Sequence, residues 1–181
     1  MKNHGIKKAL PLSQVYRFLE PGPVVLLTVF GKDRPNVMAM SWHMMIDFEP
    51  PLVGCVVSNR DYTFDILRKT RECVLNIAPA ELAKQVTGCG NTSGRNTDKF
   101  KKFGLTASAA SQVGAPIIDE CFASFECRVV DDTMADKYNI FILEVVKAWI
   151  DRRKKYKTLH HCGRGNFMIS GRTIKLASKM K

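Results

Sequence analysis

Short apolar segments rich in β-branched residues follow one another along this chain, and most are separated by turns, not by long helices. Residues 24–30 and 36–42 flank a Gly31-Lys32-Asp33 turn, which is the pattern of a β-hairpin. Strands in hairpin-like succession pair antiparallel, whereas regular strand–helix alternation would give a doubly wound parallel sheet. The sequence therefore predicts a mainly β fold with inserted helices, built as an antiparallel barrel with Greek-key-like connections.

The expected elements can be stated by residue range. Strands are expected over 24–30, 36–42, 44–48, 52–57, 73–77, 123–130 and 138–150. Helices are expected over 11–19, 61–70, 79–86 and 98–103, and the segment 88–97, rich in Gly, Asn, Ser and Thr, is expected to form a loop. Residues 1–10 are expected to be a loosely held lead-in, and residues 172–181 a basic tail.

A chain of 181 residues has the size of one domain and can bury a core, so we treat residues 1–181 as a single domain. No apolar run approaches the roughly 20 residues of a membrane span, and no apolar region follows the basic segment 1–10 to make it a signal peptide. We therefore expect a cytoplasmic protein. The six cysteines form no C-x-x-C pair and no zinc-site spacing with histidine, so we expect reduced thiols and no bound metal.

The net charge of +11 favours anionic partners, which include nucleotides, nucleic acids and anionic surfaces. Part of the excess is local, because residues 152–157 form a basic run and Lys175, Lys179 and Lys181 crowd the C-terminus. Such runs are most often solvated faces or frayed ends. A nucleic-acid-binding module is an alternative that rests on charge alone. Aromatic residues are not interleaved with the basic runs and no nucleic-acid reader motif is present, so nucleic acid is not an expected partner.

One polar segment, Ser58-Asn59-Arg60-Asp61-Tyr62-Thr63, follows an expected buried strand and opens an expected helix. Free backbone N–H groups and the positive end of the helix dipole meet at such a point, which suits a phosphate group. Ser58 and Thr63 add hydroxyl donors, and Arg60 adds a cation that can bind two oxygens at once. The alternative is that these residues only cap the helix. The sequence thus indicates either a phosphate site or a capped helix start.

Three further segments have both a functional and a structural interpretation. Residues 36–43 alternate small and sulfur-containing side chains, so this strand could lie flat against a planar ring or could simply be half-buried. The polar segment around Ser93-Gly94-Arg95 and Lys99 could close over an anionic ligand or be a solvated connection. Residues 160–165 contain two adjacent histidines that point to opposite sides of an extended chain, and we expect a turn without a ligand there.

The chain has no G-x-G-x-x-G or Walker A sequence and no Ser/His/Asp order or carboxylate pair of a hydrolase, which favours chemistry carried by a bound cofactor. From residue 21 to 171 the sequence resembles the flavin reductase-like family, the FMN-binding split barrels, and within it the flavoredoxins most. The segments that carry the resemblance are 36–43 (NVMAMSWH), 47–53 (DFEPPLV), 58–67 (SNRDYTFDIL) continuing to 73–76 (CVLN), and 87–106, which contains SGRNTDKF and FGLT.

The resemblance implies a homodimer that binds FMN near its subunit interface and moves electrons from NAD(P)H or a protein donor to a flavin, a metal complex or a redox-protein partner. It implies an oxidoreductase. A non-catalytic electron carrier is one alternative, and a flavin- or haem-binding barrel of the pyridoxamine-phosphate-oxidase type is another. By position, the residues implied to contact FMN are Met38, Ala39, Ser41 and Trp42 at the ring and ribityl chain, Ser58, Arg60 and Thr63 at the phosphate, Asn76 and Ala78 at the ribityl side, and Ser93, Gly94 and Lys99 in the closing loop.

Overall fold

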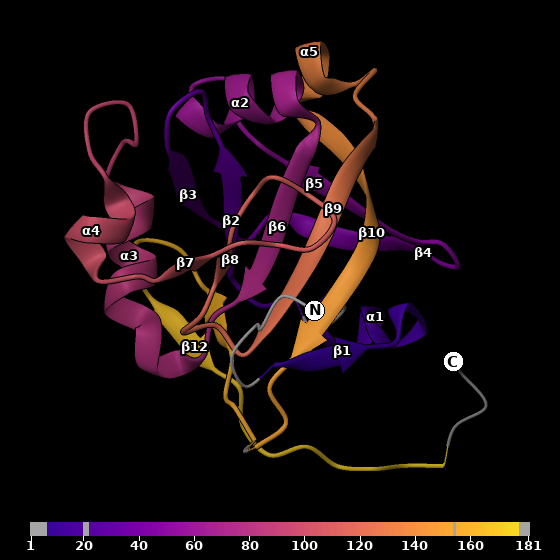
Figure 1. Ribbon diagram of the computed structural model, residues 1–181. Coiled ribbons are helices and arrows are strands. Elements are labelled where there is room, and N and C mark those ends of the chain that lie inside the picture. The colour runs from indigo at the N-terminus through magenta and orange to yellow at the C-terminus, as the bar shows by residue number, and fades with distance from the viewer. Residues whose placement is uncertain (1–6, 20–21, 154, 178–181) are drawn as a thin grey trace.

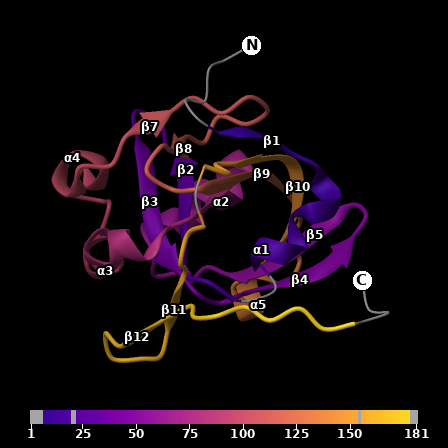
Figure 2. The same ribbon diagram turned by 90° about the horizontal axis from the view of Figure 1, so that it is seen from below.

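The hairpin pattern of the sequence is realised as one curled antiparallel sheet of eight strands (Figures 1 and 2). The computed structural model describes residues 7–19, 22–153 and 155–177. Along the sheet the strands follow the order β3-β2-β6-β9-β10-β5-β4, and β1 pairs separately with β10. The prediction of a mainly β, antiparallel fold with inserted helices is therefore confirmed.

The described chain divides into the following elements. The strands of the large sheet are β1 (Lys8–Leu10), β2 (Val25–Phe30), β3 (Pro35–Met40), β4 (His43–Phe48), β5 (Pro51–Val56), β6 (Glu72–Ile77), β9 (Ala123–Asp131) and β10 (Ile140–Ile150). Two short pairs lie outside it, β7 (Ala107–Ser108) with β8 (Ile117–Ile118), and β11 (Leu159–His161) with β12 (Phe167–Ile169). The α-helices are α1 (Tyr16–Leu19), α2 (Tyr62–Thr70), α3 (Ala83–Asn91), α4 (Lys99–Phe103) and α5 (Ala135–Tyr138), and 3₁₀ turns cover Leu12–Gln14 and Ala80–Leu82. None of the helices in these ranges is long and apolar enough to cross a membrane.

The barrel is open along one seam, between β3 and β4. These two strands are consecutive in the chain and are joined by only Ser41 and Trp42, yet they lie at opposite ends of the strand order and do not pair. Figure 2 shows the strands arranged around a common axis, with α3 and α4 outside the curve of β2 and β3. The seam leaves β3 and β4 as edge strands, and the residues that join them lie at the mouth of the split.

Strand β2 shows why this part of the sequence is apolar without alternation. Val25, Leu27 and Val29 belong to the main core inside the barrel. Leu26, which points to the other side, belongs to a second core formed outside the barrel with Val86 of α3 and residues of α4. A strand that is buried on both faces has apolar residues at every position. The second core holds α3 firmly against β2 and β3 and so builds a wall beside β3.

The cysteines behave as small apolar residues, as the sequence predicts. Cys55, Cys73 and Cys127 lie in the main core and are almost completely buried. All six cysteines are free thiols, and burial raises the pKa of the Cys55 thiol well above its ordinary value. These three cysteines therefore serve as packing groups of the core.

Helix α3 is longer than the sequence predicts. The prediction of a loop over 88–97 is wrong for its first part, because the helix continues to Asn91. A Cβ on Gly88 would lie 2.4 Å from Cε1 of Phe103, so glycine lets α3 and α4 approach closely at this position. Tertiary packing here outweighs the low helix propensity of the two glycines in the segment.

The N-terminal segment is also more ordered than expected. Residues 1–6 lie outside the described ranges, but the prediction of a loose lead-in is wrong for residues 7–10, because β1 pairs with β10. The Lys7 side chain is buried, and its ammonium donates a hydrogen bond of 2.7 Å to the Ile118 carbonyl. Burial lowers the pKa of Lys7, an effect that nearby Cys121 and three carboxylates partly oppose. At the other end, residues 171–177 have no regular structure, and residues 178–181, with Lys179 and Lys181, lie outside the described ranges.

Candidate binding cleft

Two adjoining cavities lie beside β3. The smaller one, which we call the polar cavity, has a volume of about 280 Å³ and is also lined by the start of α2. The larger one, the wide cavity, has a volume of about 610 Å³ and is bounded by α3 and the β11–β12 hairpin. Both are lined by Ala39, Gly90 and Asn91, so they adjoin at these residues, and we treat them together as one candidate cleft. The wide cavity alone has the size of a small-molecule or cofactor site, which is about 300–1,000 Å³.

The polar cavity is built around the N-terminal end of α2. Arg60, Asp61, Tyr62 and Thr63 all line it. Thr63 is buried, and its hydroxyl oxygen accepts a hydrogen bond of 3.0 Å from the Asn36 side-chain amide. The Arg60 side chain is exposed and forms no ion pair with the described residues. The first N–H groups of a helix have no partner within the helix and carry its positive dipole end, so this corner favours an anion.

The segment between α3 and α4 also lines the polar cavity, through Thr92, Ser93 and Gly94. Gly94 is buried and packs so tightly that a Cβ there would lie 1.9 Å from Oδ1 of Asn36. The guanidinium of Arg34 holds this segment by hydrogen bonds to the carbonyl oxygens of Gly94, at 2.9 Å, and Arg95, at 3.0 Å. The cavity wall therefore depends on close contact between a glycine and the β3 side chain that also binds Thr63.

Lys99 is a buried cation at the same cavity. Its ammonium donates hydrogen bonds of 2.8 Å to the carbonyl oxygens of Val37 in β3 and Cys89 in α3. Burial lowers the pKa of Lys99, and nearby Cys89 and Asp61 partly oppose that shift. Lys99 thus ties α3 to β3 and contributes positive charge to the polar cavity.

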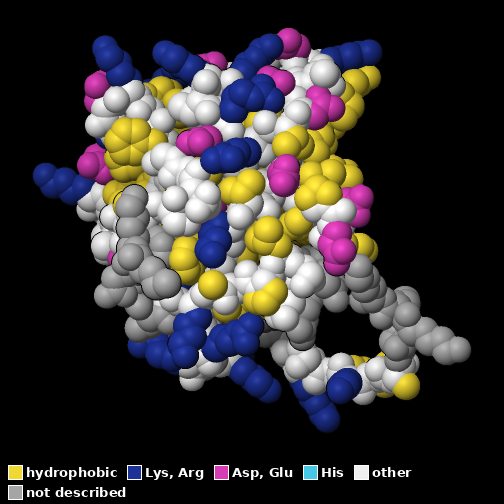
Figure 3. Space-filling view, turned by 45° about the vertical axis from the view of Figure 1, so that its right-hand side comes forward, with side chains coloured by type: hydrophobic (Ala, Val, Ile, Leu, Met, Phe, Trp, Pro, Cys, Tyr) yellow, Lys and Arg dark blue, Asp and Glu magenta, His cyan; other side chains and the backbone are white. Residues whose placement is uncertain are grey.

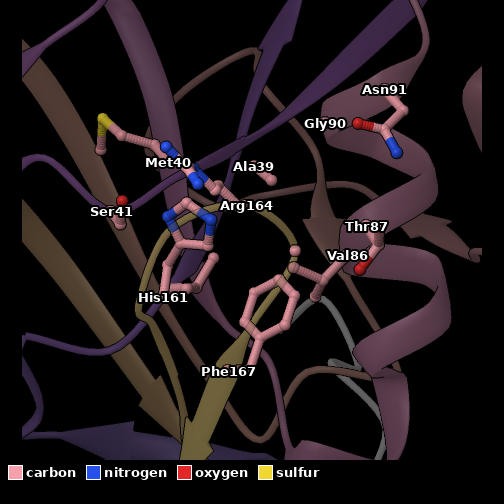
Figure 4. Close-up of a pocket in the computed structure, with 12 residues that line it drawn as sticks. Ala39, Met40, Ser41, Val86, Thr87, Gly90, Asn91, His161, Arg164 and Phe167 are labelled. Atoms are coloured by element: carbon pink, nitrogen blue, oxygen red, sulfur yellow. The ribbon is translucent and has the colours of Figure 1, made fainter.

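The wide cavity has three sides, which Figure 4 shows together. Ala39, Met40 and Ser41 come from the end of β3 and its connection to β4, and α3 contributes four residues with mostly small side chains. The β11–β12 hairpin provides His161, Arg164 and Phe167. The His161 and Phe167 rings contact each other, with centroids 5.3 Å apart. The α3 members are Val86, Thr87, Gly90 and Asn91.

The turn of this hairpin is unusual in its backbone. Gly163, Arg164 and Gly165 have φ values of 89°, 51° and 77°, so three successive residues lie in the left-handed region. The turn is closed by a hydrogen bond of 2.9 Å from the Cys162 N–H to the Asn166 carbonyl. A non-glycine residue in this conformation is uncommon, and the flanking glycines allow it. The result is a tight turn that carries the Arg164 side chain to the cavity.

The structure brings most of the sequence-predicted site residues together. Met38, Ala39, Arg60, Thr63, Ser93, Gly94 and Lys99 line the polar cavity, and Ala39 and Ser41 line the wide cavity. Four of the expected residues line neither cavity. Among these, Trp42 is 71% exposed beyond the end of β3, and the Ser58 hydroxyl accepts a hydrogen bond of 3.2 Å from the Arg60 N–H. This hydrogen bond lets Ser58 stabilise the turn that precedes α2.

Asn76 and Ala78 are the other two expected site residues that line neither cavity. Ala78 is completely buried in the second core. The Asn76 side chain is also completely buried, and its amide donates to the Leu26 carbonyl at 3.0 Å. Its oxygen accepts hydrogen bonds from the Ile118 N–H, at 3.0 Å, and the Ser124 hydroxyl, at 2.8 Å. Asn76 therefore joins β2, β6, β8 and β9 from inside the protein.

The hairpin side of the cleft is not predicted by the sequence. The sequence predicts a turn over residues 160–165, and the structure has a turn at 163–165. Residues up to His161, however, form β11, and both His161 and Arg164 line the wide cavity, which the sequence does not predict. Nothing in residues 159–169 alone indicates contact with β3, more than 100 positions earlier in the chain. The local signal that was available is the Gly163-Arg164-Gly165 sequence, which is suited to a left-handed turn.

His43, next to the seam, gives the fold a predicted dependence on pH. Its Nε2 is 2.7 Å from the Pro23 carbonyl, and its buried Nδ1 has no partner among the described residues. Burial lowers the pKa of His43 below its ordinary value of 6.5, and the Pro23 hydrogen bond only partly opposes this. The unfolded chain therefore takes up a proton on His43 before the folded chain does as the pH falls.

We expect the free energy of unfolding to decrease as the pH falls through 6.5 toward the lowered folded pKa. Each unit of difference between the two pKa values corresponds to about 1.4 kcal/mol. Urea unfolding of wild type and His43→Gln, at about pH 7.5 and about pH 5, measures the effect. The variant should lose part of the wild-type pH dependence, and the exposed His161→Gln serves as control for removing an imidazole. An unchanged pH dependence in His43→Gln would show that this histidine is not the group responsible.

Comparison with known proteins agrees with this architecture. A family model described as a flavin reductase like domain matches residues 17–169. An uncharacterized Escherichia coli K12 protein, YddH, is 33% identical over 180 residues, which cover 91% of this chain and 95% of that protein. Among solved structures, an FMN-binding domain of a flavin reductases-like enzyme from Shewanella baltica has a TM-score of 0.88 at 22% identity, with 94% of this chain and 97% of that chain covered. Flavoredoxin of Desulfovibrio vulgaris has a TM-score of 0.79 at 20% identity, with 87% and 91% covered.

Proposed function

Because the chain belongs to the flavin reductase-like family, we propose that its cleft binds FMN and that the bound flavin passes electrons from a donor to an acceptor. The observation that supports this proposal most is that the two cavities lie next to each other. A polar cavity suited to a phosphate adjoins a wide cavity suited to a planar ring, and Ala39, Gly90 and Asn91 line both. FMN has the same two parts, a phosphate and an isoalloxazine ring, linked by a ribityl chain.

The polar cavity fits the phosphate by charge and by shape. Arg60, Lys99 and the first turn of α2 place positive charge around it. A phosphate monoester carries a charge of about −1.5 to −2 at pH 7, so these groups would contribute much of the affinity. Gly94 fits as well, because any larger residue there would push Asn36 and Thr63 out of place.

The wide cavity fits the ring. Ala39 and Ser41 present small side chains, which leave room for a flat group against the end of β3. When bound, FMN supplies hydride and single-electron transfer at its ring system. Arg164 would place a cation beside the ring, where it would favour the negative charge that a flavin gains on reduction. Phe167 and Val86 would exclude water from the ring.

We propose NAD(P)H as the donor and a free flavin, a metal complex or a redox protein as the acceptor. The second candidate function is that of an electron carrier without catalytic turnover, like the flavoredoxins. The similarity of the fold to that of a solved flavoredoxin supports this candidate. Steady-state oxidation of NADH and NADPH with added free flavin separates the two. Turnover indicates a reductase. A chain that binds FMN but does not turn over with either nucleotide is a carrier.

We further propose that the chain forms a homodimer with the cleft near its interface. Edge strand β4 and the residue before it expose Trp42, Met44 and Ile46, with exposed fractions of 71%, 62% and 45%. Figure 3 shows hydrophobic side chains exposed on the side of the molecule that carries β4 and β10. An exposed apolar edge strand is a common place for a second chain to pack. Sedimentation equilibrium gives the mass, and a monomer at micromolar concentration would contradict the proposal.

The substitution Arg60→Ala tests the phosphate corner. We expect FMN affinity to fall about tenfold, because a hydrogen bond from a cation to a charged acceptor contributes about 1.5 kcal/mol or more. Titration with FMN, followed by flavin fluorescence, measures the change. Affinity for riboflavin, which lacks the phosphate, should stay the same. Arg68→Ala, at the other end of α2, is the matched control and should leave both affinities unchanged. Equal loss with FMN and riboflavin would place Arg60 away from the phosphate.

A further inference from the structure

A third cavity lies between the end of β10, residues 151–152 and 155–158, and the start of the C-terminal segment, and we call it the basic cleft. Its volume is about 810 Å³, larger than either cavity described above. Its apolar lining includes Phe18, Phe122, Ile150 and Tyr156. The Phe122 and Tyr156 rings are stacked, with centroids 4.8 Å apart and planes 8° from parallel. The cleft therefore has an aromatic floor on which a further flat ring could lie.

Four cations among the described residues line this cleft, and none of them forms an ion pair with another described residue. Arg152, Lys155, Lys157 and Arg172 line the cleft and are exposed. No ion pair or side-chain hydrogen bond links any of the four to the described residues. Figure 3 shows Lys and Arg side chains gathered at the lower end of the molecule and along the extended C-terminal segment. This concentration of positive charge favours an anionic ligand.

Among the described residues that line the cleft, the one carboxylate does not cancel that charge. Asp151 is only 3% exposed, and its oxygens accept hydrogen bonds from the Tyr156 hydroxyl, at 2.5 Å, and the Arg153 guanidinium, at 3.1–3.2 Å. Its charge is therefore matched by Arg153, which leaves the four cations of the rim available. The same contacts fix the Tyr156 ring in the floor and hold Arg153 beside Asp151.

Only a thin wall separates the basic cleft from the wide cavity. Pro23 and His160 face the basic cleft, whereas their neighbours Val24 and His161 face the wide cavity. The two segments of the wall are joined by a hydrogen bond of 2.7 Å from the Val24 N–H to the Leu159 carbonyl. Ser170 closes the end of the wall by hydrogen bonds with Thr158 of 2.8 and 2.9 Å. A ligand in the basic cleft would thus lie one strand away from the proposed ring site.

We propose that the basic cleft binds an adenylate group, with the purine on the aromatic floor and the phosphates among the four cations. Apolar aromatic surface beside unpaired cations is complementary to a ligand that combines a flat ring with phosphate. The group has two possible sources, the adenosine end of a nicotinamide dinucleotide donor or a separate nucleotide. The first source rests on the proposed function, whereas the site itself does not depend on FMN.

Calorimetric titration of the full chain with adenosine 2′,5′-bisphosphate, before and after saturation with FMN, tests the proposal. The bisphosphate should bind more tightly than either adenosine or inorganic phosphate. The double variant Lys155→Glu/Arg172→Glu should weaken binding at least about tenfold. Its matched control is Lys69→Glu/Lys101→Glu, which reverses two exposed charges on α2 and α4 and should leave binding within about twofold.

Each result has a defined meaning. If the bisphosphate binds no better than inorganic phosphate, or if both double variants weaken it equally, the site is wrong and only general charge attraction is present. If it binds as expected and competes with NADPH during reduction of bound FMN, the adenylate belongs to the donor. If it binds as expected without competing, the cleft serves a separate nucleotide. Failure of FMN to bind in the same preparation would contradict the proposed function but not this site.

Discussion

Replacing Gly94 by alanine is expected to weaken FMN binding about 100-fold, the largest effect on affinity that we expect from a single methyl group in this chain. The added Cβ would lie 1.9 Å from Oδ1 and 2.7 Å from Cγ of Asn36, distances that no packed structure tolerates. Asn36 must move, and with it the hydrogen bond to Thr63 at the polar cavity. Overpacking costs about 1–3 kcal/mol, and here the residues that it displaces are those of the proposed phosphate site.

Gly171→Ala is the matched control for this substitution, because an added Cβ at Gly171 meets nothing within 4 Å. Fluorescence titration with FMN should give wild-type affinity for the control and a clear loss for Gly94→Ala. Circular dichroism and urea unfolding must show that both variants fold. A folded Gly94→Ala chain with wild-type FMN affinity would mean that this segment does not close the binding site.

Asn76→Ala is expected to lower the free energy of unfolding by about 2–4 kcal/mol and to leave FMN affinity unchanged within about twofold. The variant leaves the Ile118 N–H and the Ser124 hydroxyl without their acceptor inside the protein. Each buried donor that loses its partner costs about 1–3 kcal/mol. The Asn76→Ala substitution also removes the side-chain amide that donates a hydrogen bond to the Leu26 carbonyl. Urea unfolding gives the stability, and FMN titration of the folded fraction gives the affinity.

The paired measurement separates two roles for Asn76. The resemblance implies a contact with the ribityl side of FMN, whereas the structure gives this side chain a set of buried hydrogen bonds and a place in neither cavity. The exposed Asn96→Ala is the control for removing an asparagine and should change neither quantity. A large loss of FMN affinity in Asn76→Ala without loss of stability would favour the ribityl contact and contradict the structural role.

The elements of the fold could be predicted where the sequence pattern is local. The strand expected over 24–30 is β2 at Val25–Phe30, and the helix expected over 61–70 is α2 at Tyr62–Thr70. Apolar runs, turn residues and helical spacing carry that information. The extension of α3 through Gly88 could not be predicted, because it depends on contact with Phe103 in another helix. The pairing of β1 with β10 likewise joins segments about 140 residues apart.

The same distinction holds for the cleft. The sequence predicts a phosphate corner because Arg60 and Thr63 lie in one short segment at a helix start, and both residues line the polar cavity in the structure. The hairpin side of the wide cavity was missed because Arg164 reaches Ala39 only through tertiary structure. Position in a family pattern placed Trp42 and Asn76 in the site, yet one is exposed and the other is buried away from both cavities.

The corner formed by β3 and the start of α2 is proposed to bind the phosphate of FMN. Parallel titrations of the full chain with FMN and riboflavin, followed by flavin fluorescence and visible absorbance, test it most directly. We predict saturable FMN binding that is at least about 100-fold tighter than riboflavin binding, because a doubly charged phosphate meets Arg60, Lys99 and the α2 N-terminus. Equal affinities for the two flavins, or no binding of either, would contradict the account.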